Sequence, residues 1–385
     1  MFFNVLLQLA VTLIDVTSAA PLPSTYVDAQ PLKIVSFASQ FRYADNELVT
    51  KLQKRDEVVD AKFHQTVITF PLSIDSQEIT LVADTGSYST WALNESVGGT
   101  LCDNGSCINA TNVDTSSDDY SISYIGGFSA SGKLATGTVS VGDSSSSASD
   151  FKFGLVDSSS GDNGGYSWCG LGYNTDYSSN NQQLLDVLQN GGVIDKKIFS
   201  LEYETENLDF GSDVMGSAKL TFGGYDESNS EIKFFSQSHT SSLQTSFKSV
   251  SQGSNSVDAS GSKNILFDSG STNFSAKKKY IDAIEANYTT NANYESFFTC
   301  SDYTDTTVKF QFDDSSALEI PFLDFAWTYY QDSYDLCQLM VDTLSDDDEF
   351  EMVFGQYALK NLVTVFDVEN KQVGIAPKKA GSKWA

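Results

Sequence analysis

Two short segments of this chain carry the same arrangement of residues that could do acid–base chemistry. Residues Ala83–Ser87 read Ala-Asp-Thr-Gly-Ser, and residues Phe267–Ser271 read Phe-Asp-Ser-Gly-Ser. In each, an apolar run leads to an aspartate, Asp84 or Asp268, and a glycine then permits a tight turn. One copy is weak evidence, because junctions between strands and turns often contain Asp and Gly. Two facing copies would pair two carboxyl groups, and like charges held close together keep one of them protonated. Such a pair can act as base and acid on one water molecule.

A second shared feature indicates that the chain is an internal duplication. An apolar pair followed by glycine stands at 168–170 (Trp-Cys-Gly) and again at 353–355 (Val-Phe-Gly). The two glycines lie 86 and 87 positions after the respective aspartates, which is nearly the same interval. The apolar runs 79–83 and 265–267 predict two buried strands, each ending at an aspartate.

The elements that would hold these segments are mostly strands. Short runs rich in β-branched and aromatic residues alternate with clusters of Ser, Asn, Asp and Gly, which is typical of an all-β protein. The runs that predict strands are 63–74, 138–141 and 307–312. The segments that predict helices are 182–189 and 277–287. The serine-rich tracts 144–149 and 236–262 are expected to be surface loops, the second with some strand pairing before Asn264.

These motifs together resemble the pepsin family of aspartic proteases, and within it the secreted, candidapepsin-like enzymes of yeasts. Trp91 stands seven residues after Asp84, as in the family pattern, and 122–132 is similar to the flap hairpin that closes over substrate. Residues 220–226 and 364–376 are similar to a strand near the lobe junction and to the closing hairpin. The resemblance covers nearly the whole chain after about residue 62. It implies a mainly β, bilobal pepsin-like acid protease fold, with two homologous six-stranded-barrel-like lobes and the active-site cleft between them.

The resemblance also implies roles for individual residues. Asp84 and Asp268 would form the catalytic dyad, whose microscopic roles are left open because only the titration of the pair is defined. The residues expected to support the active-site loops are Thr85, Gly86, Ser87, Ser269, Gly270 and Ser271. The flap residues expected to bind substrate are Tyr124, Gly126 and Gly127. The expected disulfides are Cys102–Cys107 and Cys300–Cys337. An ordinary aromatic strand residue is the alternative reading of Tyr124.

The chain departs from the family pattern at three places, and the first two leave a second function open. Gln356 stands where relatives usually have Asp, 125–128 alters the flap sequence, and 74–77 replaces the usual turn before Asp84. The alternative to a protease is therefore a catalytically inactive pepsin-like module that binds proteins or acts as an inhibitor. Both Asp-Thr/Ser-Gly segments are intact, which favours the enzyme.

The remaining reactive side chains predict structural roles. Five cysteines in an exported chain leave one unpaired, and Cys169 lies in an apolar segment that needs a small buried residue. His64 and His239 lie in no nucleophile or metal-ligand motif. The acidic run 346–349 lacks the spacing of a calcium loop and predicts a solvated turn. We expect neither a metal nor an organic cofactor.

The N-terminal region predicts export and activation by cleavage. Residues 1–19 are mostly apolar, too few to span a bilayer, and end in small residues, as a signal peptide does. Residues 20–55 are expected to form an inhibitory propeptide, cut after Lys54 and Arg55 by a dibasic-specific processing protease. Adjacent basic residues in an exposed linker are the alternative explanation. The N-terminal protease lobe is placed at 56–230 and the C-terminal lobe at 231–385.

Charge limits the expected partners. The chain has 23 basic and 51 acidic residues, and without residues 1–55 it has 18 and 47, a net charge of −29. This charge repels nucleic acids and anionic membranes. The expected partners are therefore polypeptide substrates in extended conformation. We expect no membrane segment after the signal peptide is removed. We expect a secreted, extracellular monomer that acts at acidic pH. The glycosylation candidates are Asn94, Asn104, Asn109 and Asn287; Asn273, also in a sequon, is expected to stay bare because it lies close to Asp268.

Overall fold

The structure, a computed structural model, describes most of the chain after residue 56. The described residues are 57–64, 67–97, 102, 105–124, 127–142, 146–160, 166–173, 182–204, 214–238, 242–259, 263–290, 297–329, 335–378 and 381–385. The predicted signal peptide, the propeptide and the Lys54–Arg55 site lie outside these residues, as do Gly126, Asn104 and His239.

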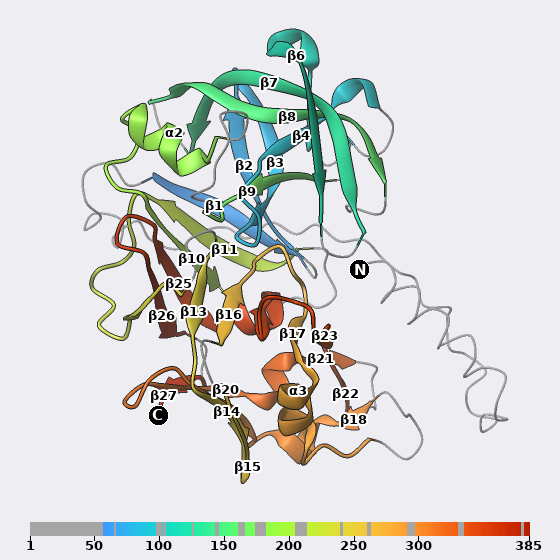
Figure 1. The fold of residues 1–385 in the computed structure, drawn as a ribbon, viewed down its shortest axis with the longest axis vertical. Coiled ribbons are helices and arrows are strands. Elements are labelled where there is room, and N and C mark those ends of the chain that lie inside the picture. The colour runs from blue at the N-terminus through green and yellow to red at the C-terminus, as the bar shows by residue number, and fades with distance from the viewer. Residues whose placement is uncertain are drawn as a thin grey trace, which may run out of the picture.

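The mainly β fold expected from the sequence is confirmed (Figure 1). The helices of the described residues are α2 (Leu184–Asn190), α3 (Lys278–Glu285) and α4 (Gln356–Leu359), with 3₁₀ turns at Glu95–Val97, Ala110–Asn112, Cys300–Tyr303 and Phe322–Phe325. None of these helices is long enough to cross a membrane. The helix predicted at 182–189 is observed at 184–190, and the one predicted at 277–287 is shorter at both ends. The helix α4 was not predicted because it is a single turn.

One large sheet runs through the upper lobe and the middle of the molecule (Figure 1). From one edge to the other its strands are β12 (Lys233–Ser236), β26 (Gln372–Pro377), β25 (Leu362–Asp367), β10 (Ile198–Glu204), β11 (Val214–Phe222), β1 (Glu57–His64), β2 (Ile68–Ile74), β3 (Gln77–Asp84), β9 (Ser167–Gly170), β4 (Trp91–Asn94), β8 (Ala148–Ser160), β7 (Ser129–Val141) and β6 (Asp114–Ser123), with β5 (Cys107–Ile108) beside β4. Strand β25 pairs antiparallel with β10 over five residue pairs. The end of the chain is thereby joined to the first half.

The lower lobe consists of three smaller sheets. The first contains β13 (Gln244–Ser246), β16 (Asn264–Phe267), β24 (Met352–Phe354), β17 (Phe274–Lys277) and β23 (Val341–Leu344). The second contains β15 (Asn255–Asp258), β14 (Ser249–Gln252), β19 (Thr307–Gln311), β20 (Ala317–Pro321) and β27 (Lys383–Trp384). The third contains β18 (Phe298–Thr299), β22 (Leu336–Leu339) and β21 (Ala326–Tyr329).

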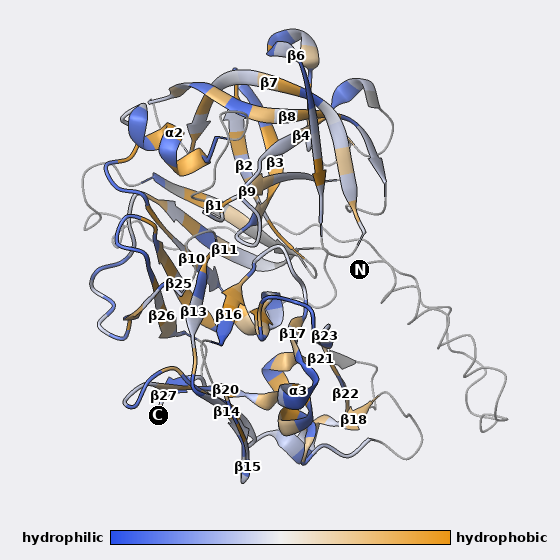
Figure 2. Ribbon diagram, in the orientation of Figure 1, coloured by the Kyte–Doolittle hydropathy of each residue, from blue (hydrophilic) through white to orange (hydrophobic). Residues whose placement is uncertain are grey.

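Burial follows the apolar pattern of the sequence. Strand β3 is buried at Leu81, Val82 and Ala83, and α2 buries four of its seven residues against the core. Figure 2 shows hydrophobic and hydrophilic colours on opposite parts of α2 and α3, as amphipathic helices require. By contrast, most of β6 is exposed, so this strand projects beyond the core as one arm of a hairpin with β7.

Part of the tract 236–262 pairs as strands, as expected before Asn264. It contains the hairpin of β14 and β15, with Val250 opposite Val257, and β14 also pairs with β19. Val250 is fully buried, and burying such a side chain stabilises the pairing even though the surrounding residues are mostly serines. The expected strand at 63–74 is divided between β1 and β2, which pair with each other through Lys62 and Phe63. The lobe boundary near residue 230 stays a prediction.

Candidate active site

Both Asp-Thr/Ser-Gly segments begin where a buried strand ends, next to a parallel partner strand. In the first half, β3 ends at Asp84, which lies opposite Gly170 of β9. In the second, β16 ends at Phe267, opposite Phe354 of β24, and Asp268 follows directly. The backbone N–H of Asp268 donates to the Phe354 carbonyl at 3.0 Å, and the Asp84 carbonyl accepts from Leu171 N–H at 2.7 Å. The shared Asp-to-Gly interval thus corresponds to one structural unit built twice.

The two aspartates face each other across their glycines. A Cβ added to Gly86 would lie 2.3 Å from Oδ1 of Asp268, and one added to Gly270 would lie 2.4 Å from Oδ1 of Asp84. Real Cβ atoms do not come so close to oxygen, so glycine is required on both sides for the carboxyl groups to meet. Asp84 is 3% exposed, and its carboxyl group hydrogen-bonds with that of Asp268.

Thr85 and Ser269 lock the two segments together with reciprocal hydrogen bonds. The Thr85 N–H donates to Ser269 Oγ at 3.1 Å, and the Ser269 N–H donates to Thr85 Oγ1 at 2.8 Å. Each hydroxyl then donates across to the opposite strand end: Thr85 to the Phe267 carbonyl at 2.7 Å and Ser269 to the Ala83 carbonyl at 2.6 Å. Both side chains are buried. These four bonds fix the relative position of the aspartates, which come from opposite halves of the chain.

The carboxylate oxygens are also held by their own turns. Asp84 Oδ1 accepts from the N–H groups of Gly86 at 2.9 Å and Ser87 at 3.2 Å, and Asp84 Oδ2 accepts from the Ser87 hydroxyl. The second turn repeats this pattern. Asp268 Oδ1 accepts from Gly270 N–H at 2.8 Å, and its Oδ2 accepts from Ser271 Oγ at 2.7 Å. Gly86, Ser87, Gly270 and Ser271 therefore lie where the resemblance places them.

Burial and mutual repulsion control the protonation of this pair. Burial raises the pKa of Asp84 far above the usual carboxyl range, and the neighbouring Asp268 raises it further, while the bonds from Ser87 and Gly86 oppose the rise. Burial also raises the pKa of Asp268, against the lowering effect of its bonds from Ser271 and Gly270. The pair therefore retains a proton at a pH where isolated carboxyl groups are ionised.

The segment expected to form the flap is the turn between β6 and β7. Tyr124 follows β6, and its N–H donates to the Phe128 carbonyl at 2.8 Å across the turn before β7. Its hydroxyl accepts from Trp91 Nε1 at 2.8 Å. Burial raises the pKa of Tyr124 well above the usual value, with a further contribution from Asp84. Gly127 adopts a φ of 87° in this turn, a conformation that favours glycine.

A buried contact beneath the second segment was not predicted. Gln356 is fully buried; its Nε2 donates to the Ser269 carbonyl, and its Oε1 accepts from the Tyr203 hydroxyl. Tyr203 belongs to β10, so this chain of contacts connects the central sheet to the Asp-Ser-Gly turn at Asp268. The sequence signal was the departure at Gln356 itself, but nothing in the sequence identified Tyr203 as its partner. The Gln356 side chain is therefore a neutral, hydrogen-bonded group at the position where relatives usually have Asp.

The cysteines have structural roles, as expected from the sequence. Disulfides join Cys102 to Cys107 and Cys300 to Cys337, with Cα–Cα distances of 5.2 and 5.3 Å. Cys169 is a buried thiol, and burial raises its pKa to about 12, which makes it a poor nucleophile. In the described part of the chain, no group of His, Cys, Asp and Glu side chains is arranged to hold a metal ion.

The sequons differ in accessibility. Asn287 is exposed, and Asn94 and Asn109 are half-buried. Asn273 is 9% exposed, and its Nδ2 donates to Asp342 at 3.0 Å. These environments support the expectation that Asn273 is a poor acceptor for a bulky glycan.

Comparisons with known proteins place this geometry in context. The profile of the family described as eukaryotic aspartyl protease matches residues 69–378. Candidapepsin-3 of Candida albicans is 24% identical over 402 residues, covering 98% of this chain and 96% of the relative. An acid protease of Saccharomycopsis fibuligera is 27% identical over 330 residues, covering 81% and 80%. The crystal structure of the aspartic proteinase from Irpex lacteus superimposes with a TM-score of 0.67 over 84% of this chain and 98% of its own, at 21% identity, which shows a shared fold.

Proposed function

This chain belongs to the eukaryotic aspartyl protease family and is an aspartic-type endopeptidase with the bilobal pepsin-like fold, and we propose that Asp84 and Asp268 are its catalytic dyad. The observation that carries this proposal is the reciprocal approach of each carboxyl group to the glycine of the opposite turn. Only a structure in which both turns are locked together by Thr85 and Ser269 allows that approach.

The proposed reaction is hydrolysis of a peptide bond by a water molecule bound between the two carboxyl groups. The ionised carboxylate takes a proton from the water as its oxygen attacks the carbonyl carbon, and the protonated partner donates its proton to the carbonyl oxygen. The tetrahedral intermediate then collapses: the C–N bond breaks, the leaving nitrogen takes a proton, and the pair returns to its singly protonated state. No covalent bond to the enzyme is formed.

This mechanism requires a pair that carries one proton, which defines its pH dependence. Loss of the first proton from the pair activates the enzyme as pH rises, and loss of the second inactivates it. Because burial raises the pKa of both aspartates, and the neighbouring Asp268 raises that of Asp84 further, the singly protonated pair extends over the acidic range. We therefore propose activity at acidic pH and its loss as the shared proton leaves.

The substrates of this enzyme are polypeptides, and we propose that they bind in extended conformation beneath the flap hairpin of β6 and β7. An extended peptide can hydrogen-bond through its backbone to an exposed strand, and closure of the hairpin excludes water from the reacting groups. Tyr124, tied to Trp91 and close to Asp84, is positioned to form the inner wall of this site.

We further propose that the enzyme is secreted as a zymogen and acts as an extracellular monomer. Relatives are named secreted aspartic proteases, which supports export of this chain. Cleavage after Arg55 by a dibasic-specific protease would leave β1, which begins at Glu57, whole and paired with β11. N-terminal sequencing of the secreted protein tests the site, since a start far from Asp56 contradicts it.

The decisive experiment compares the secreted mature protein with its Asp84→Asn variant on a denatured protein substrate from pH 2 to 8, with and without pepstatin. Cleavage confined to acid, blocked by pepstatin and lost in the variant supports the dyad. An Asp282→Asn variant, which removes an exposed carboxylate, is the matched control and should cleave normally. A folded protein that cleaves nothing at any pH would favour the non-catalytic binding module. The hydrogen-bonded packing of Gln356 supports the enzyme over that alternative, because the departure leaves no gap beneath the second turn.

A further inference from the structure

Gln356 is the middle link of a line of hydrogen bonds that ends at one of the two facing carboxyl groups. The Tyr203 hydroxyl donates to Gln356 Oε1, and Gln356 Nε2 donates to the Ser269 carbonyl. The peptide group that contains this carbonyl also contains the N–H of Gly270, and that N–H donates to Asp268 Oδ1 at 2.8 Å. Every link therefore directs its hydrogen toward Asp268.

The amide of Gln356 can take only one orientation in this line. Ser269 offers a carbonyl, which can only accept, so the Nε2 side of the amide must face it. A reversed amide would place Oε1 against that carbonyl with no hydrogen between them. Gln356 and Tyr203 are both fully buried, where a polar group without a partner destabilises the fold. The direction of the line is thus set by the fold.

The first half of the chain has a different residue behind its turn. Gly86 N–H donates to Asp84 Oδ1 at 2.9 Å, so the last bond is the same in both halves. The position that corresponds to Gln356 is occupied by Leu171, which follows the first apolar-apolar-Gly segment and has no side-chain donor. The two carboxyl groups therefore differ in the side chain that supports the peptide donating to them.

The line has an electrostatic consequence for Asp268. A hydrogen bond accepted by a peptide carbonyl strengthens the N–H of the same peptide as a donor, because each bond polarises the next. A stronger donor favours the ionised form of the carboxyl group that accepts from it. Tyr203 interacts with Asp268, and Tyr124 and Cys169 interact with Asp84. Burial raises the pKa of these three side chains, so they are neutral in acid and add no charge to the pair.

We propose that Gln356 is a positioning residue that polarises the peptide between Ser269 and Gly270 toward Asp268, and so keeps the shared proton of the pair on Asp84. This inference rests on the proposed dyad and assigns its two roles. The attacking water gives a proton to Asp268 while Asp84 gives its proton to the carbonyl oxygen. On collapse, Asp268 passes that proton to the leaving nitrogen, and Asp84 recovers its own from the intermediate.

The effect of the line is tested where Asp268 titrates without its partner, in Asp84→Asn. Adding Gln356→Met, an apolar side chain of similar length, should raise the Asp268 pKa by about half a unit, because indirect polarisation changes one hydrogen bond by a fraction of its strength. Adding Tyr203→Phe instead should raise it less. NMR titration of the carboxyl carbon measures both and requires no cleavage. Equal Asp268 pKa values with and without Gln356→Met would overturn the proposal, whether or not the chain is a protease.

The position of the proton is tested by the pH dependence of kcat/KM with both aspartates present. Gln356→Met should move the acidic limb to higher pH by a similar amount and leave the alkaline limb in place, because Asp268 is already ionised on both sides of the second step. A shift of the alkaline limb alone would put the proton on Asp268 and overturn the assignment. A common fall at every pH, with neither limb moved, would make Gln356 only a packing residue.

Two further variants control for the loss of a buried amide. Gln252→Met replaces a buried glutamine of β14, in a different sheet, and should move neither limb. Gln356→Met combined with Tyr203→Phe leaves no tyrosine hydroxyl without its acceptor, and it replaces the single variant if that protein does not fold. The double variant should shift the acidic limb no further than Gln356→Met, because Tyr203 acts only through Gln356. A further shift would contradict the line.

Discussion

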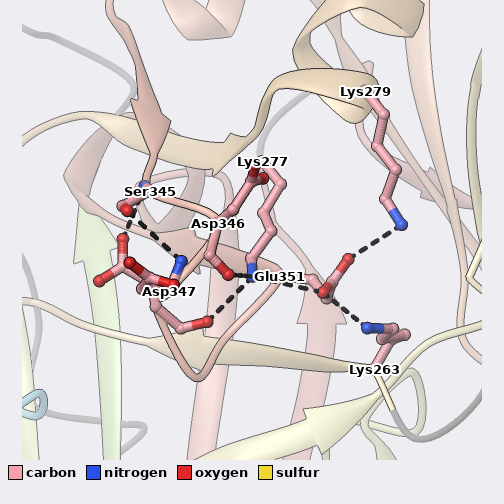
Figure 3. A network of polar contacts seen from close by, with 8 residues as sticks. Lys263, Lys277, Lys279, Ser345, Asp346, Asp347 and Glu351 are labelled. Atoms are coloured by element: carbon pink, nitrogen blue, oxygen red, sulfur yellow. Dashed lines mark hydrogen bonds and ion pairs between the residues drawn. The ribbon is translucent and has the colours of Figure 1, made fainter.

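Two buried carboxylate sites lie at opposite ends of the same pair of strands, and their protonation is opposite. Strands β16 and β24 run parallel; Asp268 follows one of them, whereas Glu351 immediately precedes the other. Glu351 is 5% exposed and accepts from Lys263 at 2.9 Å, with Lys279 at 3.1 Å and Lys277 at 3.8 Å (Figure 3). Burial alone would raise the pKa of Glu351, but the hydrogen bonds from its lysines outweigh burial and lower it to about 2.

The difference shows that the balance between burial and neighbouring groups decides the sign of a carboxyl pKa here. At Asp268, burial outweighs the hydrogen bonds that lower the pKa, and at Asp84 the second carboxyl group adds to the effect of burial. At Glu351, burial is opposed by cations. One end of the strand pair therefore keeps a proton, while the other stays ionised in acid and anchors β24, which carries the backbone contact to Asp268.

The largest expected effect comes from removing one half of the dyad. Asp84→Asn should lower kcat by a factor on the order of 10³ or more, because neither proton transfer can then be completed. The pKa of Asp268 should rise, since it loses the hydrogen bond from Asp84 that lowers it. Rates on a peptide substrate test the first effect, and NMR titration of the Asp268 carboxyl tests the second. An unchanged Asp268 titration would mean that the Asp84 hydrogen bond does not influence its pKa.

The same variant carries a stability prediction with a definite sign. A carboxyl group whose pKa is raised by folding stabilises the protein fully below its unfolded value of 3.8, and that stability is lost as pH rises through the folded pKa. Asp84→Asn should therefore be more stable than wild type near neutral pH and gain little at pH 3. Thermal melts at the two pH values measure this, and an equal shift at both would contradict it.

A smaller loss of activity is expected from Gly86→Ala. The added Cβ meets the Asp268 carboxyl group at 2.3 Å, so the two aspartates must separate. We expect kcat to fall about 10²-fold, as for other small misplacements of reacting groups, with the fold retained. Circular dichroism checks the fold, and Gly253→Ala, in an exposed turn at φ 57°, is the control for a glycine substitution. Wild-type kcat in Gly86→Ala would show that close approach of the carboxyl groups is unnecessary.

At the other end of the strands, Glu351→Gln should reduce stability and affect catalysis only indirectly. It leaves three lysines without their shared carboxylate, and we expect a loss of about 2 kcal/mol at pH 6, allowing for solvent screening of the partly exposed lysines. The sign is opposite to that of the dyad: this stability is present above the unfolded pKa of 4.5 and is lost as pH falls through about 2. Urea unfolding at pH 6 and at pH 2 should show the difference shrinking in acid.

The smallest effect is expected at an exposed ion pair, which serves as a contrast to the buried Glu351. Lys278 and Asp282 form an ion pair at 2.5 Å on the surface of α3, with side-chain exposures of 74% and 55%. Lys278→Ala should leave both activity and the urea midpoint unchanged within error, because solvent screens an exposed pair. A clear loss of stability in this variant would mean that the effect of Glu351→Gln reflects lysine density on this lobe and not burial of its carboxylate.

Much of the catalytic turn could be predicted because its constraints are local. An apolar run, an aspartate and a glycine specify a strand that ends in a tight turn, and their repetition specifies two such turns. The hairpin at 249–258 was predicted only as some strand pairing before Asn264, without bounds, for the opposite reason. Its serines resemble a loop, and only the burial of Val250 against β19 makes it a sheet.

The sequence by itself determined which residues recur, namely the two Asp-Thr/Ser-Gly turns and their later apolar-glycine strands, because these depend on backbone conformation and short-range pattern. Only the tertiary structure decided what each side chain meets. Run 346–349 is the mostly exposed turn that the sequence predicted, but only the structure shows that the carbonyls of Asp346 and Asp348 accept from Lys277, 69 and 71 positions away (Figure 3). The hydrogen bond between Tyr203 of the central sheet and Gln356 was likewise visible only in the structure. Such contacts depend on how distant strands pack, and so does the opposite titration of Asp268 and Glu351 at the two ends of one strand pair.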